Sequence, residues 1–196
     1  MSTILEQRQT GLMTADELLT MSNSRWGYEL VRGKLKKYMP AGNLHGIIAL
    51  KIGRIIGNFV EDNDLGVVVA AETGFFISRN PDTVRAPDSA FIGKEKLAKH
   101  GITENFFPAA PDLAVEVVSP SDKKKDIEDK VQDYLAAEVN LIWIIYPRKQ
   151  FVVVHRQSKV VSILFETDEL EGEEVLPNFR LPLERLFGNL PVIKEN

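Results

Sequence analysis

The chain has no cysteine among its 196 residues, and this absence excludes several kinds of chemistry. Without thiols there is no disulfide framework, no thiolate metal site and no cysteine nucleophile. Any metal ion must therefore be held by oxygen or imidazole ligands. The sequence also has no Gly-rich phosphate-binding loop, no Gly-x-Ser-x-Gly elbow and no His-Glu-x-x-His pair, which removes P-loop NTPases, the common serine hydrolases and zinc peptidases.

Long apolar runs and an excess of positive charge are also missing. No run approaches the roughly 20 apolar residues of a membrane-spanning helix, and the N-terminus, MSTILEQRQT, lacks the basic and apolar regions of a signal peptide. A cytoplasmic protein is therefore expected. The net charge of −4 has the wrong sign for a protein whose whole surface binds phosphate backbones, although a small basic cleft can still hold a few phosphates.

What is present fits one compact domain, because 44% of the residues are hydrophobic and no repeat or linker divides residues 1–196. Helical spacing of apolar residues predicts helices over 45–61 and 123–137, and a capping box at Thr14–Glu17 predicts a short helix before them. A hairpin is expected over 28–39 and a short closing helix over 181–187. Extended runs are predicted at 66–78, 84–92, 112–119, 141–146, 151–156 and 160–166. This mixed order predicts an α/β or α+β domain around one sheet.

Two carboxylates, Asp88 and Glu116, fall on runs that are otherwise apolar, and both are expected to point into an apolar face. Burying an ionised carboxylate without a partner costs several kcal/mol, so a shared cation such as Mg²⁺ or Mn²⁺ is the favoured explanation. Each acid could instead pair with a basic residue such as Arg85 or Lys130. Asp112 lies about 13 Å from Glu116 along the strand axis, so it is expected only to start the strand.

The order Pro87-Asp88 followed by Glu116 on the next run resembles the PD-(D/E)xK nuclease superfamily, whose sites hold metal ions on those two acids. A more specific frame surrounds these residues: YELVRG, MPAGNLH, VRAPDSAF, PDLAVEVVSPSD, KVQDY, LIWIIYP and LPNFRLPLERLF. From about residue 14 to 187 this frame resembles the Uma-type family of bacterial restriction endonucleases. The resemblance implies a restriction-endonuclease-like mixed central sheet flanked by helices, with an N-terminal hairpin. It also implies Mg²⁺ or Mn²⁺ as cofactor and nucleic acid as partner, with DNA ahead of RNA.

The sequence departs from the superfamily pattern at its lysine. That lysine, two residues beyond the second acid, would fall at Val118, which cannot offset negative charge. The resemblance favours Lys130 as the stand-in, because it lies beside Tyr134 on the following helix and its ammonium could reach back over the sheet end. A solvated ion pair with Asp126, four residues earlier, is the alternative. A second departure is Glu138, where the family usually has glycine; glycine suits a left-handed helix end, so strain is expected there.

Glu29 and His45 complete the set of candidate site residues. The resemblance makes Glu29 a further metal or water ligand, whereas its place on a hairpin strand by itself indicates an exposed residue. His45 either starts a helix or lies near the scissile phosphate, and it alone of the three histidines matches a family motif. The lysines at 123–125 form either a solvated helix start or phosphate contacts.

The sequence therefore predicts a metal-dependent nuclease. Asp88, Glu116 and Glu29 are expected to bind the metal, and Lys130 and His45 to complete the catalytic set. A catalytically inactive nucleic-acid or protein-binding module on the same fold is the alternative, favoured by the missing superfamily lysine. A two-fold homodimer would suit a nuclease that cuts both strands, but no heptad or exposed apolar stripe in the sequence identifies an interface.

Overall fold

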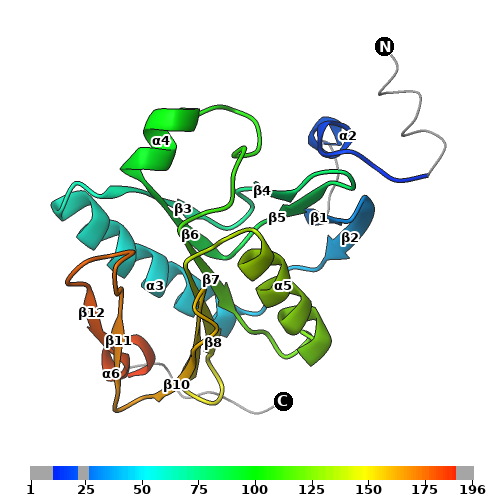
Figure 1. Cartoon of the computed structure of the whole chain (residues 1–196). Coiled ribbons are helices and arrows are strands. Elements are labelled where there is room, and N and C mark those ends of the chain that lie inside the picture. The colour runs from blue at the N-terminus through cyan, green and yellow to red at the C-terminus, as the bar shows by residue number, and fades with distance from the viewer. Residues whose placement is uncertain (1–10, 22–26, 189–196) are drawn as a thin grey trace.

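The structure, a computed structural model, describes residues 11–21 and 27–188, and it confirms the mixed α/β architecture (Figure 1). The central sheet has six strands, and a smaller antiparallel sheet has four. Across the central sheet the order is β10 (Val161–Phe165), β9 (Phe151–Arg156), β8 (Leu141–Tyr146), β7 (Leu113–Val117), β6 (Ser89–Gly93) and β3 (Gly66–Ala70). The smaller sheet has the order β2 (Lys34–Tyr38), β1 (Gly27–Val31), β5 (Thr83–Arg85) and β4 (Phe75–Ser78).

Two long helices cover opposite faces of the central sheet. These are α3 (Asn43–Asp62) and α5 (Lys124–Ala136), and Figure 1 shows the sheet between them. The neighbouring strands β7 and β8 are parallel, and α5 is the crossover that connects them. The shorter elements are α2 (Ala15–Thr20), α4 (Lys94–His100), α6 (Leu183–Phe187) and a ribbon formed by β11 (Glu169–Glu171) and β12 (Arg180–Pro182). None of the described helices is long and apolar enough to cross a membrane.

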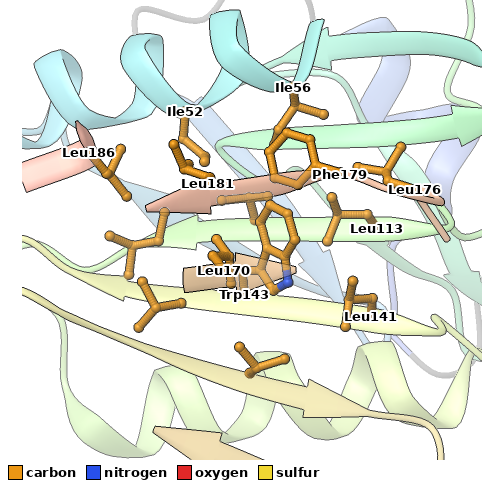
Figure 2. Packing of buried hydrophobic residues seen from close by; sticks show 14 of the residues in the cluster. Ile52, Ile56, Leu113, Leu141, Trp143, Leu170, Leu176, Phe179, Leu181 and Leu186 are labelled. Atoms are coloured by element: carbon orange, nitrogen blue, oxygen red, sulfur yellow. The ribbon is translucent and has the colours of Figure 1, made fainter. Parts of the chain in front are cut away.

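The main core lies on the α3 side of the sheet. Figure 2 shows Ile52 and Ile56 of α3 above Trp143 of β8, with Phe179 and Leu181 between them. The Trp143 and Phe179 rings stack with centroids 5.8 Å apart. Because side chains alternate along a strand, every second residue of β7 and β8 faces α5 instead. Ala114, Ile142 and Ile144 form a second, smaller core there. Glu116 belongs to that second face.

Several local predictions are confirmed. Thr14 and Glu17 make both hydrogen bonds of the capping box, and the hairpin and both long helices lie where they were expected. Glu138 has φ 60° at the end of α5. The N–H groups of Glu138 and Val139 bond to the carbonyls of Leu135 and Tyr134, respectively, as in a Schellman motif. Glu138, at the position where glycine is usual, thus adopts the left-handed backbone conformation that glycine favours.

Two strand predictions were wrong. The runs 66–78 and 84–92 are each broken, because β3 and β6 belong to the central sheet while β4 and β5 belong to the smaller one. Asp88 therefore lies in the break between β5 and β6 and not on a strand face, and Pro87 before it has no N–H to continue a ladder. Residue 72 lies in a turn, His100 ends a helix that was not predicted, and β11 and β12 were also missed.

Candidate active site

A pocket of about 440 Å³ brings all five predicted site residues together. It opens where the smaller sheet meets the ends of β6 and β7 and the first turn of α3. Its walls include Glu29 of β1, His45 of α3, Asp88 before β6, Glu116 of β7 and Lys130 of α5. A second pocket, of about 950 Å³, is larger but contains none of these residues, so the chemistry directs attention to the smaller one.

Glu116 is buried, with 4% of its surface exposed, and both carboxylate oxygens accept hydrogen bonds from α5. Lys130 Nζ donates to Oε2 at 2.7 Å and the Tyr134 hydroxyl donates to Oε1 at 2.7 Å. Burial raises the pKa of Glu116 to about 7; Lys130 acts against this shift, while Asp88 and Glu29 add to it.

Lys130 forms ion pairs with two of the candidate acids. Besides its bond to Glu116, Nζ lies 3.5 Å from Glu29 Oε1. Burial alone would lower the pKa of Lys130, but Glu116 and Glu29 raise it above its usual value, so the ammonium stays charged. The alternative pairing with Asp126 is wrong: the Asp126 carboxylate lies 3.0 Å from Lys36 Nζ of β2 instead.

Asp88 is anchored next to Glu116 by the backbone of β7. Its Oδ2 accepts the Val117 N–H at 2.7 Å and lies 3.1 Å from His45 Nε2. The hydrogen bond with Asp88 raises the pKa of His45, although partial burial acts in the opposite direction. The Asp88 side chain keeps 18% of its surface exposed, against 5% for the side chain of Glu116, so Asp88 is the more accessible acid of the pair.

Glu29 is buried and not exposed on the hairpin. Arg85 Nη1 donates to its Oε2 at 2.8 Å and the Ala86 N–H donates to its Oε1 at 3.2 Å. Burial alone would raise the pKa of Glu29, but the positive charges of Lys130 and Arg85 lower it below its usual value. Glu29 is therefore an ionised carboxylate between two cations.

Arg85 and Asp133 are the residues that sequence reasoning missed. Arg85 Nη2 and Nε bond to Asp133 Oδ2 at 2.5 and 3.0 Å, and only 1% of the Arg85 side chain is exposed. From the sequence, Arg85 was a suggested partner of Asp88 or Glu116, but Arg85 joins Glu29 of β1 to Asp133 of α5. The signal was Asp133 itself, a charged residue beside Tyr134 on the buried side of α5.

Asp88 and Glu116 fit a hard divalent cation by donor type and charge. The burial-raised pKa of Glu116, increased further by neighbouring carboxylates, marks negative charge that a cation would relieve. In the described part of the chain no group of three or more His, Asp or Glu side chains is placed to hold a metal. Two carboxylates are enough for Mg²⁺, which usually takes one or two and completes its shell with water and substrate phosphate. Glu29 fits less well, because Arg85 and Ala86 already bond to its oxygens.

Comparison with known proteins identifies the family of the chain. The crystal structure of "a putative nuclease belonging to DUF820" from Anabaena variabilis is similar, with a TM-score of 0.77 and 21% sequence identity over 89% of this chain and 97% of that chain. At this identity the likeness shows the restriction-endonuclease-like fold. No curated protein matches. Residues 15–184 match the Uma2 family, described as "Putative restriction endonuclease". The chain belongs to the Uma2 family.

Proposed function

We propose that the protein is a divalent-metal-dependent nuclease that hydrolyses phosphodiester bonds in nucleic acid, with DNA as the preferred substrate. One observation carries the proposal. Lys130 reaches from α5 to within 2.7 Å of Glu116, in the same pocket as Asp88, and supplies the positive charge that Val118 cannot. In this proposal Asp88, Glu116 and Lys130, which line one pocket, correspond to the two acids and the lysine of the PD-(D/E)xK pattern, although the lysine comes from a different element.

Each residue has a distinct role in the proposal. Asp88 and Glu116 would hold Mg²⁺ or Mn²⁺, which when bound activates a water molecule and offsets charge on the phosphate. Tyr134 and Lys130 orient the Glu116 carboxylate through their hydrogen bonds. The charged Lys130 ammonium faces the pocket, where it can stabilise the negative charge that builds up in the transition state. His45, held by Asp88, would contact the phosphate.

We assign Glu29 a positioning role in place of the expected metal contact. It keeps Lys130 charged from 3.5 Å away and is itself held by Arg85. Because Arg85 also bonds to Asp133 on α5, the same network ties the helix that carries Lys130 to the smaller sheet. A change at Glu29 should therefore act on catalysis through Lys130 and leave metal affinity nearly intact.

Cleavage assays with matched lysine variants test the proposal. Lys130→Met keeps a good helix former of similar length but removes the charge, so cleavage of plasmid and single-stranded substrates in Mn²⁺ should fall roughly 100- to 1000-fold, with substrate binding little changed. Lys99→Met, an exposed lysine on α4, is the control and should cut like wild type. Asp88→Asn should abolish the same cleavage. If Lys130→Met cuts as fast as wild type, Lys130 has no catalytic role.

A non-catalytic binding module on the same fold is the second candidate. The observation in its favour is that both oxygens of Glu116 are engaged by Lys130 and Tyr134, so a cation would have to compete with an existing ion pair. Fluorescence anisotropy with labelled DNA and RNA separates the two candidates when run beside the cleavage assay. Binding without cleavage in Mg²⁺, Mn²⁺ and Co²⁺ would favour the module and reject the nuclease.

A further inference from the structure

Strand β10 at the edge of the central sheet exposes a row of large apolar side chains. Val161, Ile163 and Phe165 have 53%, 56% and 58% of their surfaces exposed, and Val160 before them has 55%. The intervening Ser162 and Leu164 point to the other face, where Leu164 packs on the main core. No exposed apolar stripe was predicted from the sequence, because alternation alone does not show that this strand lies at an edge.

The exposed row extends an uncovered part of the sheet face. The β9–β10 register places Val161, Ile163 and Phe165 opposite His155, Val153 and Phe151, respectively. On this face α5 packs over β7 and β8. Outside the area that α5 covers, three aromatic rings contact one another in a row. The centroids of the Tyr146 and Phe151 rings are 4.4 Å apart, and those of the Phe151 and Phe165 rings are 6.3 Å apart.

The edge of β10 also lacks the features that protect other edge strands. An exposed edge is usually blunted by charges, proline, a bulge or a covering element. Edge strand β2 carries three lysines, and β3, at the far edge of the central sheet, packs against α3 and α4. The five residues of β10, VSILF, contain no charge and no proline and pair with β9 in an unbroken register. Among the described residues no strand pairs with its outer edge, although Asp168 bonds to the N–H and C=O of Phe165 at one end.

We propose that β10 is a homodimer interface, at which two copies of this chain pair antiparallel across a two-fold axis at Ile163. This register places Ile163 opposite Ile163 and Ser162 opposite Leu164; Phe165, whose N–H and C=O are bonded to Asp168 of its own chain, ends the ladder. It also brings opposite charges together, since Lys159 before the strand comes beside the Glu166–Asp168 segment of the other copy. The strand is thus complementary to itself, as a two-fold interface requires.

Pairing at β10 joins the two central sheets into one continuous sheet. In Figure 1 this edge lies at the bottom of the view. Directly opposite side chains on paired strands have Cβ atoms about 4.5–5.5 Å apart, so the exposed rows of the two copies lie side by side on one face of the joined sheet and pack against each other along their shared flank. The inference rests only on the strand edge and holds whether or not the pocket is catalytic.

Matched isoleucine variants test the interface. Light scattering after size exclusion should give twice the 22.0 kDa chain mass for wild type and the single mass for Ile163→Lys. Ile102→Lys, at an isoleucine 81% exposed in a loop, is the control and should remain dimeric. Circular dichroism checks that both variants fold. A monomeric wild type at all concentrations, or an Ile163→Lys dimer, would overturn the proposal.

Cross-linking tests the register directly, because the chain has no cysteine of its own. In the proposed register Ile163→Cys faces its symmetry mate at a Cα separation of about 4.5–5.5 Å, within the range of a disulfide. Mild oxidation should therefore convert most of this variant to a covalent dimer on non-reducing gels, whereas Ile102→Cys should give only slow, concentration-dependent product. Failure of Ile163→Cys to cross-link faster than Ile102→Cys would reject antiparallel pairing at β10.

Discussion

Replacing Arg85 with methionine should cost the protein about 3 kcal/mol of unfolding free energy, at the lower end of the range for breaking a buried ion pair. Methionine retains much of the apolar volume but removes the guanidinium, which leaves Glu29 and Asp133, with 5% and 9% of their side chains exposed, without their main partner. We expect a loss at the lower end of that range because each carboxylate keeps a second basic neighbour in the variant. Lys130 lies 3.5 Å from Glu29, and Arg32 lies 3.3 Å from Asp133.

Urea unfolding followed by circular dichroism measures this loss, and in a domain of this size it corresponds to a melting temperature lower by roughly 10 °C. Arg180→Met is the control, because Arg180 also bonds to a carboxylate, that of Glu169, but is exposed, so its variant should unfold like wild type. Without Arg85, less positive charge opposes the effect of burial, so the pKa of Glu29 should rise from its lowered value. The folded variant should then bind a proton at a higher pH than folded wild type does.

The stability deficit of Arg85→Met should therefore shrink as the pH falls toward 4, and the double variant Glu29→Gln/Arg85→Met should lose less than the sum of the two single variants. Two outcomes would refute the reasoning. One is a loss below about 1 kcal/mol at pH 7, the size of a single ordinary hydrogen bond. The other is a deficit of about 3 kcal/mol that does not change with pH, because the cost would then arise from packing and not from buried charge.

Three further predictions concern single positions. Glu138→Gly should raise the unfolding free energy by about 0.5–1 kcal/mol in urea titrations, because glycine adopts φ 60° without strain; no gain would mean that the turn is relaxed. The unfolding free energy of wild type relative to Glu116→Gln should fall by up to roughly 3 kcal/mol as the pH rises from 4.5 to about 7. The reason is that a raised pKa favours the folded state only while Glu116 is protonated. If the difference between the two proteins does not change with pH, the pKa of Glu116 is not raised. Mn²⁺ should raise the melting temperature of wild type and of the exposed-site control Asp64→Asn, but not of Asp88→Asn; an equal shift in all three would place the ion elsewhere.

The local elements and most of the candidate site could be predicted from the amino-acid sequence. Helical spacing, alternation and the capping box depend on neighbours within a few residues, so the hairpin, α3 and α5 could be predicted from the chain alone. The family frame identified the five residues that meet in the pocket. The position of Lys130 and Tyr134 on one side of a helix was also readable, because residues four apart share a face.

Two features could not be predicted without the three-dimensional fold: which extended run joins which sheet, and which buried charge pairs with which partner. The runs 66–78 and 84–92 look continuous in sequence, but each crosses from one sheet to the other, and this places Asp88 in a break beside β7. Arg85 of β5 bonds to Glu29 of β1 and to Asp133 of α5, and these three residues are far apart in the sequence. The exposure of β10 likewise follows from its place at the end of the strand order. Pairing of strands and of buried charges depends on the free energy of the whole assembled core, and no local window of sequence contains it.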